Sequence, residues 1–405
     1  MDIQPILASL RKHKIPAALI VLEIALACAV LCNAVFMIGQ RVSEIHVSNA
    51  IDETGISDIS VQGIDPKTAN GDIPGYLAAL REIPGVTAVT EINMMPLANN
   101  SWNTNVATGP SDALQQNSPN VAEYLFTRGG PEALGLRLLQ GRLFNAEEYA
   151  DSKLGDSYLP SGHAALLTKS LAEHLWPGQL ALGKQVWVGK NNYYTVVGVV
   201  ADVLRPDSNR GLPQFHWAAF FPVSPALGIQ DFVVRSAPQD RARILSLGMQ
   251  KLEALSPSVV VKGQTFSEIR DKFFANTRSM AWMLVLVCVV MLAVTAFGIV
   301  GLTSFWVGQR RRQIGIRRAV GATRSHIMQY FQTENFLLST AGVAIGMILA
   351  FGVNLYLMQH YQLNRMPWYY LPASAIALWL LGQLAVLGPA LRAANVPPVV
   401  ATRSV

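Results

Sequence analysis

The segment that decides the fold is QRRRQIGIRRAVGATRSHIMQYFQTE, residues 309–334. It is strongly basic, and its one acid is Glu334. Its arginines are Arg310, Arg311, Arg312, Arg317, Arg318 and Arg324. Long apolar runs lie on both sides of it. Because a basic segment between membrane-crossing helices is typical of the cytoplasmic side, the sequence predicts a cytoplasmic connection within a membrane protein.

The same segment predicts a short helix, a break and a second helix. Gly321 is suited to end a helix because glycine adopts the left-handed cap without a steric penalty. Thr323 is suited to begin the next helix as its N-cap. We expect a surface helix over about 310–320, a break at Gly321 and Ala322, and then a helix that enters the bilayer. The short helix has few side chains for a core of its own, so we expect a cytoplasmic partner to bind it.

Four apolar runs are long enough to cross a bilayer, which takes roughly 20 residues. They are residues 15–38, 279–309, 335–364 and 366–391. The first exceeds the ~7–15 apolar residues of a signal peptide, which favours an uncleaved span. Its acid, Glu23, has two interpretations: a hydrogen bond to a neighbouring helix, or a proton or ion site.

The flanking charges orient these spans. Arg11, Lys12 and Lys14 precede the first run, whereas Arg392 and Arg403 follow the last. Both termini and residues 309–334 are therefore predicted to be cytoplasmic, with the large middle part outside. The net charge of +6 reflects this topology, and nucleic-acid binding is not indicated.

The predicted organisation follows from these runs and charges. The boundaries are a cytoplasmic N-terminus 1–14, spans 15–40, 279–308, 335–361 and 366–391, an extracytoplasmic domain 41–278, a coupling segment 309–334 and a tail 392–405.

The outer domain is predicted to be α+β. Residues 73–83 favour a helix that packs Tyr76, Leu77 and Leu80, and residues 170–176 favour another. Strands are predicted by their patterns over 85–90, 164–167, 183–188 and 193–200. Residues 94–120 form a polar, Asn-rich stretch that predicts a loop. Cysteines occur only in the apolar runs, at Cys28, Cys32 and Cys288, so the outer domain is expected to fold without disulfides.

Apolar stripes with helical spacing flank the outer domain. One follows the first span and the other precedes the second: Ile38, Val42, Ile45, Phe266, Ile269 and Phe273. We expect two stalk helices, packed side by side, that carry movement; ordinary amphipathic packing is the alternative. In the third span, Gly342 and Gly346 allow close helix approach, within the chain or in a dimer.

Enzyme signatures are weak. Residues 178–185, GQLALGKQ, imitate a phosphate-binding loop, but Gln185 stands where Ser or Thr is needed, and a strand is predicted next. No zinc-protease motif or nucleophile elbow occurs. We predict no catalytic, metal or cofactor site in this chain.

Residues 312–322, RQIGIRRAVGA, resemble the R-x-E-I-G-I-R-R-A-x-G-A segment of the MacB/FtsX-type permeases, which are type VII ABC transporters. The pieces GLRLLQGRLF and YTVVGVV of the outer domain, and the closing PALRAANVPP, are similar to further family motifs. The resemblance implies a multi-pass protein of the bacterial inner membrane, whose periplasmic domain is a porter subdomain with an inserted lobe at about 123–224.

The resemblance also implies a function and partners. A cytoplasmic ABC ATPase dimer, which binds ATP and Mg, would act on a coupling segment and move the periplasmic domain by mechanotransmission. The coupling residues would be Arg312, Gln313, Ile314, Gly315, Ile316, Arg317, Arg318, Ala319, Gly321 and Ala322. Efflux of a drug, peptide or similar compound is expected, with a membrane-fusion protein and an outer-membrane duct.

Alternatives remain open at this point. A lipoprotein-releasing permease and an FtsX-like regulator of a cell-wall hydrolase share the architecture, and a sensor subunit is a further rival. Gln313 replaces the family's usual Glu, which removes a charge at the coupling segment. A heterodimer with a different permease subunit would lose that charge on one side only; a homodimer is the alternative.

Overall fold

The computed structural model of the chain describes residues 14–65, 67–100, 102–112, 118–155, 158–206, 212–225, 231–361 and 365–395. Arg11, Lys12, Arg403 and most of the predicted tail lie outside the described residues. The chain divides into two units: residues 46–276, and the residues before 46 together with those from 277 onward. Each unit is considered by itself.

The helical unit is built from long apolar helices. Its elements are α2 (Lys14–Ile45), most of α8 (Phe266–Gln309), α9 (Arg311–Ala319), α10 (Arg324–Tyr361) and α11 (Tyr370–Ala394). Among the described residues, α2, α8, α10 and α11 are long and apolar enough to cross a membrane. Their exposed side chains include Phe297 and Ile348, which are 76% and 74% accessible, as expected for surfaces that face lipid.

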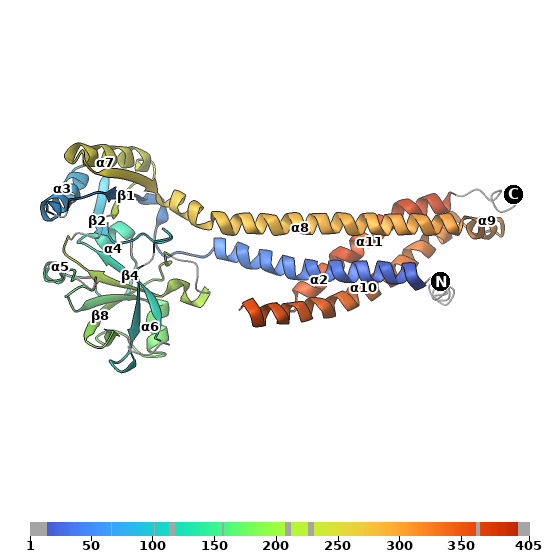
Figure 1. Cartoon of the computed structure of the whole chain (residues 1–405), viewed down its shortest axis with the longest axis horizontal. Coiled ribbons are helices and arrows are strands. Elements are labelled where there is room, and N and C mark those ends of the chain that lie inside the picture. Colours follow the sequence, from blue (N-terminus) through green and yellow to red (C-terminus); the bar gives the residue numbers. More distant parts are fainter. Residues whose placement is uncertain are drawn as a thin grey trace. The chain divides into compact units, whose positions relative to one another are not determined.

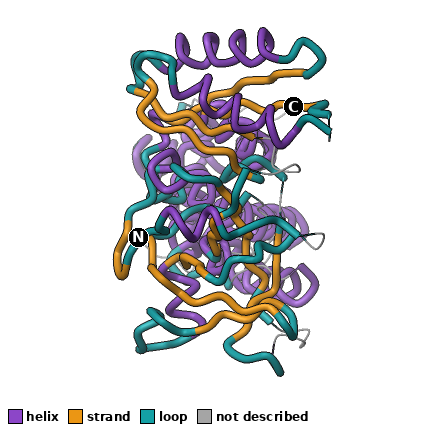
Figure 2. The backbone as a smooth tube through the Cα atoms, turned by 90° about the vertical axis from the view of Figure 1, so that its left-hand side faces the viewer, coloured by secondary structure: helices purple, strands orange, loops and turns teal. Residues whose placement is uncertain are grey.

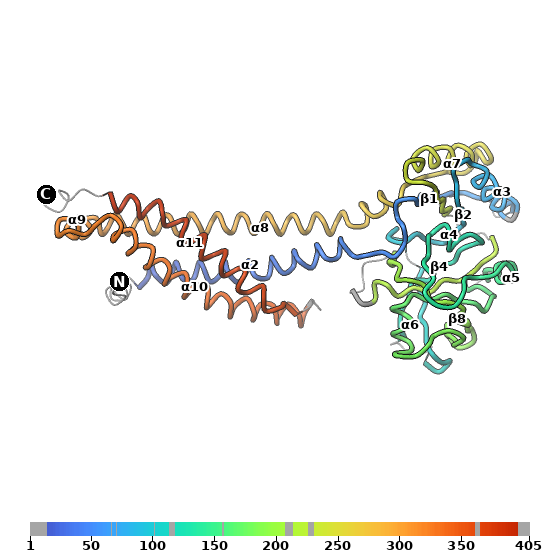
Figure 3. Tube along the Cα trace, turned by 180° about the vertical axis from the view of Figure 1, so that it is seen from behind, coloured from blue at the N-terminus to red at the C-terminus, as the bar shows by residue number. Residues whose placement is uncertain are grey.

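Helices α2 and α10 pack closely along their length (Figures 1 and 3). Gly342 and Gly346 of α10 make this possible, because a Cβ at Gly346 would lie 2.5 Å from the Cβ of Cys28. A Cβ at Gly342 would lie 2.8 Å from the Cβ of Ile24. The structure therefore places both glycines against α2 of the same chain.

Two buried asparagine side chains form hydrogen bonds with backbone groups of the same unit. Asn33 of α2 donates to the carbonyl oxygen of Ala350 of α10 at 3.1 Å, and Asn354 accepts from the backbone N–H of Met366 at 3.1 Å. The Glu23 carboxylate packs directly against Gly298 of α8, where a Cβ would collide with it. Glu23 thus faces another helix of this chain.

The α/β unit is built on one sheet. Among the described residues this sheet has 11 strands, in the order β11-β1-β10-β2-β4-β3-β7-β8-β6-β9, with β5 paired to β8. The strands are β1 (Ile56–Gln62), β2 (Val86–Ile92), β3 (Asn103–Ala107), β4 (Asn120–Phe126), β5 (Leu138–Gly141), β6 (Ala164–Thr168), β7 (Gln185–Val188), β8 (Asn192–Val200), β9 (Ala218–Pro222), β10 (Asp231–Ser236) and β11 (Val260–Thr265). Most neighbouring strands are antiparallel, but β4 pairs with β9 and β6 pairs with β8 in parallel.

Helices cover this sheet in two groups, each with its own apolar core. Helices α3 (Ala69–Arg81) and α7 (Arg241–Leu255) bury side chains such as Leu80 and Ile244 against β1, β2 and β10. Helix α6 (Lys169–Leu175) buries Leu171 in a second core with β6 and β8. The remaining short helices are η1 (Glu53–Gly55), α4 (Gly130–Leu134), α5 (Ala146–Ala150) and η3 (Leu212–His216). Figure 2 shows the strands of this unit in orange.

Two sequence-based expectations in this unit need correction. The stretch 94–120 is not all loop, because β3 forms within it and pairs with both β4 and β7. Helix α3 begins at Ala69, earlier than predicted, and includes Pro74 in its interior. Its predicted face is correct, since Tyr76, Leu77 and Leu80 are buried.

Candidate functional site

The connection between α8 and α10 forms a helix, a break and a helix, as predicted. Helix α9 ends at Ala319, and Gly321 follows with φ of 104°, a left-handed conformation that glycine adopts most easily. The N–H of Ala322 donates to the carbonyl oxygen of Arg317 at 3.0 Å and closes the turn. The hydroxyl of Thr323 then accepts from the N–H of His326 at 3.2 Å, which caps α10.

Three arginines, Arg310 just before α9 and Arg317 and Arg318 within it, bond to the membrane-type helices. Arg310 donates to both carboxylate oxygens of Glu334 on α10, at 3.1 and 3.2 Å. Both partners are buried, and the guanidinium of Arg310 also lies 5.5 Å from the ring centroid of Trp306 on α8. Both bonds come from one guanidinium nitrogen, Nη1, and a buried, charge-assisted contact of this kind is stronger than a neutral hydrogen bond. It ties the end of α8 to α10.

The other two arginines reach α10 and α11. The guanidinium of Arg317 lies 5.0 Å from the ring centroid of Tyr330 on α10, a cation–π distance. Arg318 donates to the carbonyl oxygen of Ala394 at 2.9 Å, at the C-terminal end of α11, where the helix dipole favours a cation. Helix α9 is thereby connected to all three helices beside it.

The opposite face of α9 is exposed. Ile314 and Gly315 are buried, whereas Arg311, Arg312 and Gln313 are exposed. Two apolar side chains are also exposed: Ile316 is 48% accessible and Val320 is 84% accessible. We call the exposed residues Arg311, Arg312, Gln313, Ile316 and Val320 the outer face of α9. An apolar centre with a basic rim has the composition of a protein-binding surface.

The sequence did not reveal which arginines would be free. Charge counting treats all six as equivalent, yet Arg310 and Arg318 are committed to contacts inside the chain. An ion pair of Glu334 could have been predicted, because an acid next to a membrane-crossing apolar run needs a partner. Its partner is 24 residues away, which no local pattern indicates.

In the α/β unit, a second set of contacts surrounds the residues that follow α2. We call residues 46–55 the strap. On one side, the N–H of Ala50 donates to the carbonyl oxygen of Asp202 at 3.1 Å, and Asn49 accepts from the N–H of Leu204 at 3.3 Å. These bonds join the strap to the segment that follows β8.

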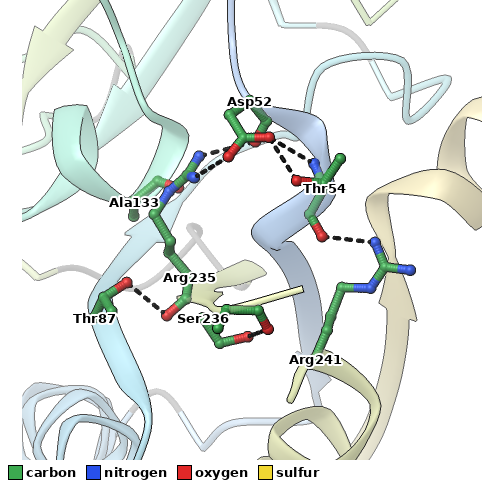
Figure 4. Close-up of polar contacts among 8 residues, drawn as sticks. Asp52, Thr54, Thr87, Ala133, Arg235, Ser236 and Arg241 are labelled. Atoms are coloured by element: carbon green, nitrogen blue, oxygen red, sulfur yellow. Dashed lines mark hydrogen bonds and ion pairs between the residues drawn. The ribbon is translucent and has the colours of Figure 1, made fainter. Parts of the chain in front are cut away.

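Two arginines hold the other side of the strap (Figure 4). Arg235 of β10 contacts the carboxylate of Asp52 at 3.4 Å and donates to its backbone carbonyl at 3.1 Å. It also donates to the carbonyl oxygen of Ala133 in α4 at 3.0 Å. Arg241 of α7 donates to the carbonyl oxygen of Thr54 at 2.9 Å.

A third arginine joins the strap to α8. Arg270 donates to the Glu53 carboxylate at 2.8 Å and to the carbonyl oxygen of Val47 at 3.0 Å. Both ionic side chains are about a quarter exposed, at 24% and 23%. The strap therefore bonds to the segment after β8, to β10, to α7 and to the first turns of α8.

The predicted stalk residues divide into two groups. Phe266, Ile269 and Phe273 of α8 are buried, and the ring of Phe273 lies 6.3 Å from that of Phe215 in η3. This stripe thus contributes to packing of the α/β unit. Ile38 and Ile45 of α2 are half-buried and Val42 is 43% accessible.

The segment that imitates a phosphate loop has no such geometry. Lys184 bonds to the side chain of Gln179, and β7 begins at Gln185, where a phosphate loop needs a helix. No group of three or more His, Cys, Asp or Glu that could hold a metal occurs among the residues that the structure describes.

Comparison with protein families matches two models to this chain. The MacB-like periplasmic core domain matches residues 17–248, and the FtsX-like permease C-terminal model matches residues 285–398. The chain belongs to the MacB/FtsX-type permease family. The first of these models covers more than half of the chain, and the second covers α9 and the helices that hold it.

Curated relatives carry the name macrolide export ATP-binding/permease protein MacB. The protein from Chromobacterium violaceum is 27% identical over 229 residues, which is 54% of this chain and 33% of the relative. That from Marinobacter nauticus is 25% identical over 291 residues, 68% of this chain and 40% of the relative. The chain therefore spans about a third to two fifths of the length of these relatives.

Two solved structures are among those that match part of this chain. One is the periplasmic region of MacB from Actinobacillus actinomycetemcomitans, with 16% identity, a TM-score of 0.37, and coverage of 55% of this chain and 93% of that one. The other is the extracellular domain of the noncanonic ABC-type transporter YknZ from Gram-positive bacteria. It has 15% identity, a TM-score of 0.34, and coverage of 51% of this chain and 99% of that one.

Proposed function

We propose that this chain is the permease subunit of an ABC transporter that works by mechanotransmission. The observation that carries the proposal is the geometry of α9. Arg317 and Arg318 hold it to α10 and α11, and Arg310, the residue before it, joins α8 to α10, whereas its outer face is exposed. A push on the outer face would therefore move the ends of three helices together.

A cytoplasmic ATPase dimer, formed by separate chains, is the partner proposed for the outer face. It would bind ATP and Mg, and this chain would hold neither. Burial of Val320 would contribute about 1.5–3 kcal/mol to association, and burial of Ile316, which is already half-buried, about half as much. Arg311 and Arg312 at the rim would attract an acidic surface on the ATPase.

The strap is the proposed receiving end of this movement. Helix α8 is continuous from Phe266 to Gln309, so a displacement along it would reach Arg270. Arg270 bonds to Glu53 and Val47 of the strap, and the strap bonds in turn to the segment after β8, to β10 and to α7. A shift of α8 would therefore be passed to the α/β unit through short, charge-assisted bonds.

The proposed biological outcome is efflux. With the termini and α9 in the cytoplasm, the α/β unit lies in the periplasm and expels a drug, peptide or similar compound already outside the inner membrane. A membrane-fusion protein and an outer-membrane duct would complete the path. The macrolide-export name of the relatives supports this choice.

The test targets the apolar part of the outer face. Val320→Glu and Ile316→Glu place charges at exposed positions, so the fold is expected to survive while the ATPase dimer no longer co-purifies with the permease. Leu255→Glu, at a residue in α7 that is 55% accessible, is the matched control. Full retention of the ATPase by both α9 variants would overturn the proposal.

A further inference from the structure

The α/β unit contains an open cleft of about 750 Å³. It is lined by residues of α3 and β2 and by residues of α4 and α5. Its walls include the buried side chains Leu77, Val89, Tyr149 and Val223. The volume is within the range of small-molecule sites, and the lining combines these apolar side chains with polar ones such as Thr87 and Thr127.

Charged residues stand at the rim of this cleft. They are Arg81, Arg128 and Glu132, so the lining has one more cation than anions. Among the described residues neither arginine forms an ion pair. Arg81 donates only long bonds, at 3.4 Å to the carbonyl oxygen of Arg128 and at 3.5 Å to that of Val89.

The two arginines repel each other. Partial burial lowers the pKa of Arg81, and the charge of Arg128 lowers it further. The backbone beside Arg128 packs closely on β2, since Gly129 has φ of 98° and a Cβ there would lie 2.7 Å from the carbonyl oxygen of Val89. Two like charges are thus held together beside an apolar cleft, an arrangement that a bound anion would stabilise.

We propose that this cleft binds a small amphiphilic anion, whose carboxylate or phosphate contacts Arg81 and Arg128 and whose apolar body lies along Leu77 and Tyr149. Arginine suits this role because its planar donors match both oxyanions. The inference rests on the proposed transport function for its biological meaning, since such a molecule would be cargo. The binding itself needs neither transport nor ATP.

Photocrosslinking of the full-length protein in lipid nanodiscs tests the site. The probe is benzoylbenzoate, and the neutral benzoylbenzamide has the same shape. We expect benzoylbenzoate to label peptides that contain Leu77 or Tyr149, and the amide to label them at least about tenfold less, a factor that corresponds to about 1.4 kcal/mol of lost charge-assisted bonding.

Variants and competing ligands test whether the photolabelling occurs in the cleft. Arg81→Gln combined with Arg128→Gln should remove the labelling, and Arg137→Gln, at an exposed arginine outside the cleft, should leave it unchanged. Octanoate and a short-chain phosphatidate distinguish a carboxylate ligand from a lipid-derived phosphate, and displacement by either supports the site. Circular dichroism and the unfolding temperature confirm that the variants are folded.

Several results would overturn the inference. They are equal labelling by the amide, labelling that persists in the double variant, labelling that neither competitor displaces, or labels confined to the apolar helices. Transport that fails while cleft labelling persists would count against the proposed function alone. Transport that continues while cleft labelling is absent would count against this site alone.

Discussion

At the residue scale, the α/β unit contains a carboxylate whose burial has a measurable consequence. Glu123 of β4 is buried, and its Oε1 has no hydrogen-bond partner among the described residues. Burial raises the pKa of Glu123 to about 7 from its ordinary value of 4.5. The folded state therefore binds this proton more tightly than the unfolded state, and ionisation of Glu123 opposes folding.

Glu123→Gln should make the α/β unit less sensitive to alkaline pH. Above pH 7 the wild type keeps a buried charge that the variant lacks, so the variant should be more stable at pH 8, by up to about 3 kcal/mol. The difference should shrink as the pH falls from 7 towards 4.5. Thermal unfolding at several pH values measures this, with exposed Glu253→Gln as the control; parallel pH profiles for Glu123→Gln and wild type would refute it.

Arg270 is the residue that joins the strap to α8. Arg270→Ala should lower the free energy of unfolding of the α/β unit by about 1.5–3 kcal/mol, because a charged donor and two acceptors lose their bonds. It should also reduce transport while leaving the ATPase bound. Arg243→Ala removes an exposed pair with Asp240 and should cost less than about 1 kcal/mol. If both variants lower the free energy of unfolding equally, the contact of Arg270 with the strap stabilises the unit no more than an exposed ion pair does.

At the scale of elements, the break between α9 and α10 depends on one backbone conformation. Nothing lies within 4 Å of a Cβ built on Gly321, so a side chain there meets no steric obstacle from neighbours. The penalty comes from φ of 104° alone, which is worst for β-branched residues.

Gly321→Val should therefore reorient α9 and uncouple ATPase stimulation from transport, while the protein still inserts into the membrane. The backbone penalty is about 1–2 kcal/mol. Gly321→Asn is the matched control, because asparagine tolerates the left-handed conformation and should retain most activity. A quantitative efflux assay gives the answer, and unchanged efflux by Gly321→Val would contradict the role assigned to this break.

At the scale of the whole molecule, the proposed topology makes a direct prediction. A cysteine at Ser111 should react with an impermeant thiol reagent added to sealed cells, and one at Ser325 should not. Cys28, Cys32 and Cys288 are replaced first, although all are buried. Labelling of Ser325→Cys from outside would place α9 on the wrong side of the membrane for an ATPase.

The assembly around this chain is a second prediction at this scale. Gln313 is exposed on the outer face of α9, where the family usually has Glu. In the proposed complex, a neutral side chain there would weaken an ionic contact with the ATPase, and a heterodimer with a Glu-bearing permease would lose that contact on one side only. We expect native mass spectrometry of the complex to find this chain beside a different permease. Two copies of this chain with two ATPases would favour the homodimer instead.

The sequence alone determined the features that depend on neighbours along the chain. The apolar runs indicated the long helices, Gly321 and Thr323 indicated the break, and the alternation in 193–200 indicated β8. What depends on distant residues came only from the tertiary structure. The Arg310–Glu334 pair, the contact of Gly346 with α2, the arginines around the strap and the cleft between α3 and α5 all join separate segments. These residues come together only when the separate helices and strands pack against one another. The sequence near each residue therefore does not indicate which distant residue it will contact.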